Sequence, residues 1–120
     1  MKFLMLTYGN LEKWSSIPED QFPELIAQQD AFNRKYRETG ELIGAFGLAD
    51  ATEAKLIGRR DGEPIVTEGP YLETKEYIAS FYLLDVESEA RAHEIAAEMP
   101  WSDRTPNEVW PILHEVAPDQ

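Results

Sequence analysis

Residues 67–86 read TEGPYLETKE followed by YIASFYLLDV, and this stretch decides the fold of the chain. The Gly69-Pro70 pair is typical of a turn that closes one extended segment, and a short polar loop follows it. From residue 76 to residue 86, aromatic and aliphatic side chains occupy both alternating faces of an extended segment. The pattern predicts a long strand in the centre of a sheet.

The residues before this stretch predict a strand, a helix and two further strands. Residues 1–8 are apolar on both faces of a strand, and residues 17–39 have a helical period that ends at Gly40. Pro18 lies near the start of this helical segment, and Pro23 is expected to divide it into a short turn and a main helix. The expected apolar stripe of the helix consists of Phe22, Leu25, Ile26, Phe32 and Tyr36.

A hairpin comes next, and a helix and a strand follow the central segment. Residues 42–48 and 54–60 are expected to be strands, and Asp61-Gly62 is a strong signal for a hairpin turn into residues 64–67. Ser88 can cap a second helix that ends at Pro100. Residues 108–116 alternate as a last strand, which Pro111 places near an edge or a bulge.

The order of these elements predicts an α+β fold of the ferredoxin-like split βαβ type, with the β-hairpin as an insert. Two helices can cover only one face of such a sheet, yet the first and central strands are apolar on both faces. An apolar sheet face that meets water is unfavourable, so we expect a second copy to cover it. The sequence therefore predicts a homodimer that pairs through the sheet face and forms a dimeric α+β barrel.

The stretch from Glu68 to Glu76 resembles the signature of the YCII-related family, in which many members read Asp-Gly-Pro-Phe followed by Glu-Thr-Lys-Glu. The resemblance implies the same dimeric barrel over the whole chain, residues 1–120, as a single domain of the Asp-Gly-Pro-Phe type. In shorter members, a histidine on the first helix forms part of a pair proposed to be catalytic. Gln29 aligns with that histidine here, and an amide cannot transfer the same proton near neutral pH.

Composition narrows the classes of partner. The chain has a net charge of −12, and residues 61–120 hold fourteen acidic and three basic side chains, which argues against nucleic-acid binding. This acidic half is either a solvated face or a docking surface for a basic protein partner. The chain has no cysteine and no membrane-spanning or signal segment, so we expect a cytoplasmic protein with no membrane association.

The loop from Glu68 to Glu76 is the first candidate site. Glu68 or Glu73 could accept a proton if partly desolvated, and Thr74 or Lys75 could orient an anionic or carbonyl-bearing ligand. A purely structural role is an equal alternative, in which the turn and its polar side chains fix the register of the central strand.

A cavity between the two sheets is the second candidate site. Its expected lining is Tyr8, Ser80, Tyr82 and Trp110, with His114 as a further acid or base if its strand face lines the barrel. A surface position for His114 is the alternative. The two histidines, His93 and His114, do not lie at a spacing typical of metal ligands, so we expect no bound metal and no cofactor.

Two functions fit these features. The first is a small-molecule-binding protein that could catalyse a cofactor-independent isomerisation or elimination with carboxylate acid or base groups. The second is a non-catalytic regulatory or ligand-sensing dimer. The family resemblance adds that some such proteins accompany extracytoplasmic-function sigma factors.

Overall fold

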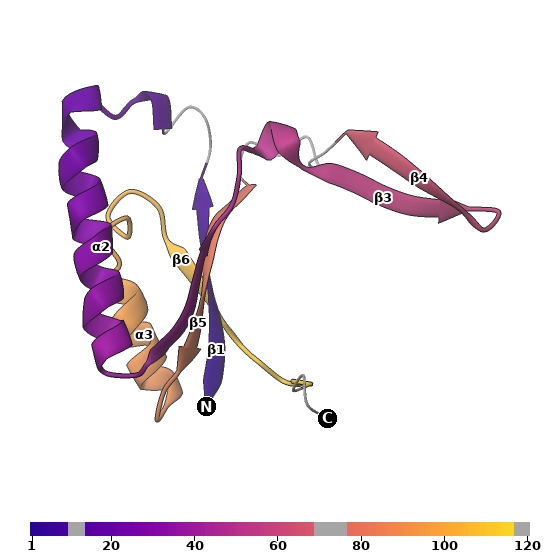
Figure 1. Cartoon of the computed structure of the whole chain (residues 1–120). Coiled ribbons are helices and arrows are strands. Elements are labelled where there is room, and N and C mark those ends of the chain that lie inside the picture. Colours follow the sequence, from indigo (N-terminus) through magenta and orange to yellow (C-terminus); the bar gives the residue numbers. More distant parts are fainter. Residues whose placement is uncertain (10–13, 69–76, 117–120) are drawn as a thin grey trace.

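The computed structural model describes residues 1–9, 14–68 and 77–116 (Figure 1). Its main sheet contains β1 (Lys2–Gly9), β2 (Leu42–Gly47), β5 (Tyr77–Asp85) and β6 (Asn107–Pro111), and a separate hairpin contains β3 (Lys55–Arg60) and β4 (Glu63–Glu68). The helices are α2 (Phe22–Glu38) and α3 (Glu89–Ala97), with 3-10 turns η1 (Glu19–Gln21) and η2 (Ala51–Glu53).

The main sheet confirms the predicted α+β fold. Its strand order is β2-β5-β1-β6, and each neighbouring pair is antiparallel. This is the order of a split βαβ plan, with α2 and α3 as the two crossover helices on one side of the sheet (Figure 1). β5 lies between β1 and β2, so the strand predicted to be central is central.

The core lies between this sheet and the two helices. Phe3 and Met5 of β1 are fully buried on the helix side, where Leu84 of β5 and Ile95 of α3 are also fully buried. Three of the five residues predicted for the α2 stripe, Leu25, Phe32 and Tyr36, are buried, and Phe22 is half-buried. The prediction for Ile26 is wrong. Ile26 directly follows Leu25 on the helix, so it points away from the core, and it is 59% exposed.

The predicted end of α2 and the predicted cap of α3 are confirmed, whereas α3 ends at Ala97 and not at Pro100. Pro23 lies in the first turn of α2, directly after the 3-10 turn η1, where its missing N–H costs no helical hydrogen bond. Gly40 follows α2 with φ +83°, a left-handed conformation that glycine adopts readily. The Ser88 hydroxyl accepts a hydrogen bond from the Arg91 N–H at 3.1 Å and caps α3.

The last strand is shorter than predicted. β6 ends at Pro111, which pairs with Phe3, and the Ile112 N–H donates to the Lys2 carbonyl at 3.0 Å. β1 begins at Lys2, so residues 113–116 have no strand beside them to pair with. The side chain of Leu113 is accordingly fully exposed.

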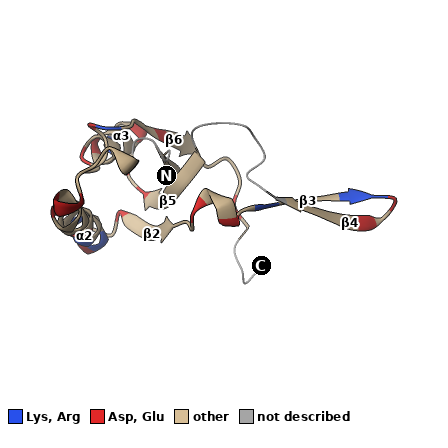
Figure 2. Ribbon diagram, turned by 90° about the horizontal axis from the view of Figure 1, so that it is seen from above, with Lys and Arg blue, Asp and Glu red and all other residues tan. Residues whose placement is uncertain are grey.

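The hairpin β3–β4 projects away from the main sheet (Figures 1 and 2). Asp61 and Gly62 have φ values of 51° and 82°, which are those of the predicted two-residue turn. Ile57 and Val66 pair across the strands and remain 68% and 60% exposed. The projection explains the radius of gyration of 16.7 Å, which exceeds the value of about 14 Å typical of a compact chain of this length.

An ion pair joins α3 to the segment between α2 and β2. Arg91 donates from Nε and Nη2 to the two carboxylate oxygens of Glu41, at 2.8 and 3.0 Å. These hydrogen bonds lower the pKa of the Glu41 carboxyl, and a hydrogen bond with Thr39 acts in the same direction. The pair therefore contributes to stability only where Glu41 is ionised.

Replacing Glu41 with glutamine is expected to lower the free energy of unfolding at pH 7 and to have a smaller effect at pH 3. The folded pKa lies below the ordinary value, so the contribution of the pair is complete above that value and is lost as the pH falls through the folded pKa. Urea unfolding at both pH values measures the difference. Glu94→Gln, which removes the 66% exposed partner of Arg91, is the control and should change stability less at pH 7. An equal loss at both pH values in Glu41→Gln would contradict this account.

The residues that the structure describes include no helix long and apolar enough to cross a membrane.

Candidate functional site on the open sheet face

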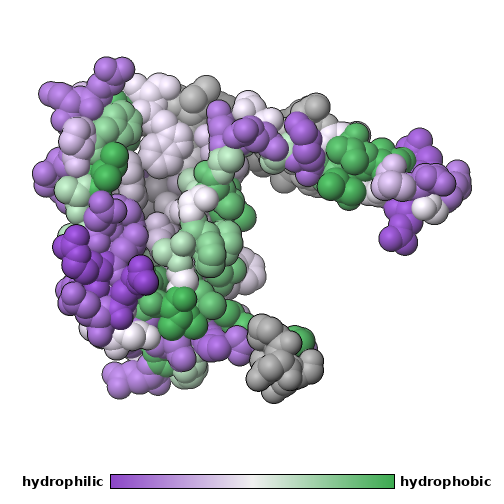
Figure 3. All heavy atoms as spheres, in the orientation of Figure 1, coloured by the Kyte–Doolittle hydropathy of each residue, from purple (hydrophilic) through white to green (hydrophobic). Residues whose placement is uncertain are grey.

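The sheet face opposite the helices, here called the open face, is apolar. Leu4, Leu6 and Tyr8 of β1 lie on it and are only half-buried, whereas the alternate residues of β1 are buried under the helices. Leu4 pairs with Leu83 of β5, and Leu6 pairs with Phe81. Figure 3 shows apolar side chains gathered over the sheet on this side of the molecule.

Two large aromatic side chains extend the open face to its outer strands. Phe46 of β2 stacks on Phe81 with ring centroids 4.9 Å apart, and it is 52% exposed. Trp110 of β6 pairs with Leu4 and is 56% exposed. An apolar patch that runs across four strands is typical of an interface or a ligand-binding surface.

One carboxylate lies within this apolar surface. Glu108 of β6 pairs with Leu6, and its Oε1 accepts hydrogen bonds from the Tyr8 hydroxyl at 3.0 Å and from Trp110 Nε1 at 2.9 Å. The second oxygen, Oε2, has no hydrogen-bond partner among the residues that the structure describes. Two aromatic donors therefore fix the carboxylate through one of its oxygens.

Tyr8 is suited to act as a hydrogen-bond donor in this cluster. Partial burial raises the pKa of its hydroxyl, and the hydrogen bond and charge of Glu108 raise it further. The hydroxyl therefore keeps its proton at neutral pH and can donate to the carboxylate. The arrangement suits a carboxylate that exchanges a proton with a bound molecule.

Tyr8 and Trp110 are the predicted site residues that the structure brings together, through Glu108. The sequence interpretation missed Glu108 itself, although alternation along residues 107–111 places it on the same face as Trp110. The alternation in the sequence therefore indicated the face of Glu108. Finding Glu108 beside Tyr8 also required the register between β6 and β1.

Ser80 and Tyr82 do not join this cluster, which corrects the predicted lining of the cavity. Ser80 pairs with Thr7 and Tyr82 pairs with Met5, so both lie on the helix side of the sheet. The Ser80 hydroxyl donates to the Tyr82 hydroxyl at 3.2 Å, and burial raises the pKa of Tyr82. Their positions fit a role in the core beneath the helices.

His114 is an exposed residue beyond the end of β6, so the strand face on which its predicted role depends does not reach it. Glu68 is the last residue of β4, and its backbone lies in the projecting hairpin. The Glu68 side chain and the residues Glu73, Thr74 and Lys75 lie outside the described part of the structure.

Gln29, which aligns with the histidine of shorter YCII-like proteins, lies on α2 and so on the opposite side of the sheet from Glu108. Its Nε2 donates to Asn33 Oδ1 at 2.9 Å. In the described ranges, no three histidine, aspartate or glutamate side chains gather in a way that could hold a metal ion.

Comparison with known proteins identifies the family. The model of the YCII-related domain matches residues 1–113. An uncharacterised protein of Rhizobium meliloti (strain 1021) is 31% identical over 99 residues, which cover 82% of this chain and 80% of that protein. Among solved structures, the 5-chloro-2-hydroxyhydroquinone dehydrochlorinase of Burkholderia phenoliruptrix AC1100, in complex with 2,5-dihydroxybenzoquinone, matches with a TM-score of 0.48 and 14% identity over 96% of each chain. The chain is therefore a member of the YCII-related family.

Proposed function

We propose that this protein is a homodimer that binds a small organic molecule between two open faces, where Glu108 exchanges a proton with it. The observation that carries the proposal is the Glu108 carboxylate, held at one oxygen by Tyr8 and Trp110 within an apolar surface. The reaction class is a cofactor-independent isomerisation or elimination.

The exposed aromatic side chains of the open face support the dimer part of this proposal. Phe46 and Trp110 are more than half exposed on a face that is mainly apolar. Pairing two such faces removes these side chains from water and encloses the Glu108 clusters in an apolar space. A carboxylate in such a space interacts more strongly with a ligand proton than it would in bulk water.

The proton transfer needs one carboxylate and no further reactant. Glu108 Oε2 takes a proton from an acidic C–H or O–H group of the ligand while Oε1 keeps its two hydrogen bonds. In an isomerisation, the resulting carboxylic acid returns the proton to a different atom of the ligand. In an elimination, the electron pair left on the ligand expels a leaving group, and the carboxylic acid gives its proton to that leaving group. In this proposal, the Glu68, Glu73, Thr74 and Lys75 loop contributes to the rim of the ligand space.

Replacing Glu108 with glutamine is expected to slow this proton exchange at least a hundredfold, because an amide cannot accept the proton. A thermal-shift screen of phenols, lactones and small carboxylic acids supplies the ligand. NMR then measures its hydrogen–deuterium exchange in D2O with the wild type and with the variant. Binding should change only a few-fold, since the amide has a similar shape.

Glu98→Gln is the matched control, because Glu98 is an exposed carboxylate on the helix side that pairs with Lys35. It should exchange the ligand at the wild-type rate. Exchange by Glu108→Gln at the wild-type rate would contradict the catalytic part of the proposal. A dimer that binds a ligand but exchanges no proton would instead favour the ligand-sensing alternative.

A further inference from the structure

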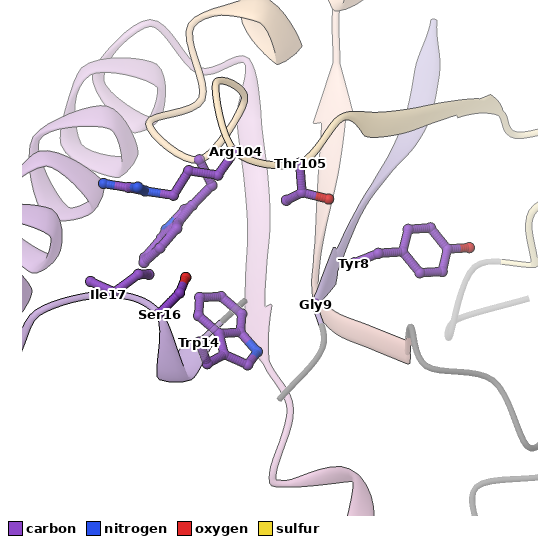
Figure 4. Close-up of a pocket in the computed structure, with 8 residues that line it drawn as sticks. Tyr8, Gly9, Trp14, Ser16, Ile17, Arg104 and Thr105 are labelled. Atoms are coloured by element: carbon purple, nitrogen blue, oxygen red, sulfur yellow. The ribbon is translucent and has the colours of Figure 1, made fainter. Parts of the chain in front are cut away.

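A cavity lies on the helix side of the sheet, where β1 ends (Figure 4). Its volume is about 170 Å³, and it opens between residues 14–17 and the turn at residues 101–105. Its lining residues are Tyr8, Gly9, Trp14, Ser16, Ile17, Trp101, Arg104 and Thr105. Tyr8 belongs to both this cavity and the Glu108 cluster, but Figure 4 shows its ring pointing away from the other lining residues.

The walls of this cavity are mainly aromatic and aliphatic. Trp14 and Trp101 meet edge to face, with ring centroids 5.0 Å apart and planes at 81°. The Trp14 indole lies directly on Gly9, where an added Cβ would approach Trp14 Cζ2 to 2.6 Å. Ile17 is buried beside them. Gly9 thus permits the close approach that positions the indole.

Two polar side chains of the cavity have no partner among the described residues. Thr105 is 6% exposed as a residue, and its hydroxyl makes no hydrogen bond within the described part of the chain. The exposed guanidinium of Arg104 likewise forms no ion pair or hydrogen bond there. The N–H groups of both residues donate to the Trp101 carbonyl, at 2.9 and 3.0 Å, which fixes the turn that carries them.

We infer that this cavity binds a small planar aromatic carboxylate of about the size of benzoate. Apolar cavities of roughly 150 Å³ accommodate a benzene ring, so the volume fits one ring. The ring lies against Trp14, Trp101 and Ile17, and its carboxylate accepts hydrogen bonds from the Thr105 hydroxyl and from Arg104 at the mouth. The Thr105 hydroxyl lines the cavity beside its aromatic walls, so it can donate to such a ligand.

Isothermal titration of the full chain with sodium benzoate tests this inference, with the neutral benzamide as a comparison. Arg104→Gln is expected to weaken benzoate binding about tenfold or more and to leave benzamide binding unchanged. Arg34→Gln is the matched control, because it removes one exposed positive charge from α2 and should leave both affinities unchanged. Both variants alter exposed side chains, so neither should impair folding.

A second variant tests the contribution of the Thr105 hydroxyl to ligand binding. Thr105→Val keeps the shape of the side chain and removes the hydroxyl, and it is expected to weaken both benzoate and benzamide several-fold. Glu108→Gln should not change benzoate binding, which separates this site from the open face. No saturable benzoate binding to the wild type, or equal affinities of Arg104→Gln and Arg34→Gln, would overturn the inference. Loss of benzoate binding in Glu108→Gln alone would place the ligand on the open face and also overturn it.

Discussion

Replacing Leu84 with alanine is expected to lower the free energy of unfolding by about 3 to 5 kcal/mol. Leu84 is fully buried on the central strand β5, where it pairs with Phe3 of β1 and with Leu42 of β2. Its side chain therefore touches both neighbouring strands beneath the helix layer, and removing three carbon atoms leaves a cavity that these strands cannot readily fill. Urea unfolding followed by circular dichroism measures the loss.

Leu113→Ala is the matched control for this prediction. Leu113 is fully exposed beyond the end of β6, so the same substitution should change the free energy of unfolding by less than about 0.5 kcal/mol. If Leu84→Ala were as stable as Leu113→Ala, the core would not lie between β5 and the helices as described.

Replacing Leu4 with glutamate is expected to convert the proposed dimer into a monomer. Leu4 lies near the middle of the open face, between Leu83 and Trp110 of the neighbouring strands. In a dimer built through this face, two copies of the new carboxylate would be buried without partners, which costs several kcal/mol per charge. In a monomer the side chain is half-buried and its charge can reach water, so the fold itself should persist.

Ile26→Glu is the control for Leu4→Glu, since it introduces the same charge at a 59% exposed position on α2. It should remain a dimer in light scattering, with a circular dichroism spectrum like that of Leu4→Glu. Equal masses for Leu4→Glu and the wild type would show that the copies do not pair through the open face.

Much of the fold could be predicted because strand residues alternate with period two. The apolar residues on both faces of residues 76–86 indicated a central strand, and β5 is central. Residues 1–8 were predicted to be a strand with two apolar faces, and they form β1 beside β5. The Asp61-Gly62 turn and the Ser88 cap were also predictable, because each depends on a local conformation that few residue types favour.

The candidate site was only partly predictable, because register is a property of two strands and not of one. Alternation showed that Ser80 and Tyr82 share a face, but both faces of their strand are apolar, so nothing local indicated which face meets the helices. The pairing of Thr7 with Ser80 decides this, and it separates Ser80 from Tyr8. The same kind of information was needed to find Glu108 beside Tyr8.

The end of the last strand was unpredictable for a related reason. Residues 108–116 alternate in the sequence, but a strand needs a neighbour along its whole length. β1 begins at Lys2 and supplies no partner beyond Ile112, so His114 lies outside the sheet. The local sequence pattern favours an extended conformation in residues 108–116, but the strand ends where its neighbour β1 begins.

The mass of the wild-type protein in solution, measured by light scattering, tests the central claim most directly. We propose that two open faces pair and enclose the Glu108 clusters, and the chain has a mass of 13.7 kDa. The expected result is therefore twice that value, 27.4 kDa, across the concentrations used for binding experiments. A mass of 13.7 kDa under those conditions would contradict the account, because the open face and Glu108 would then be exposed to water.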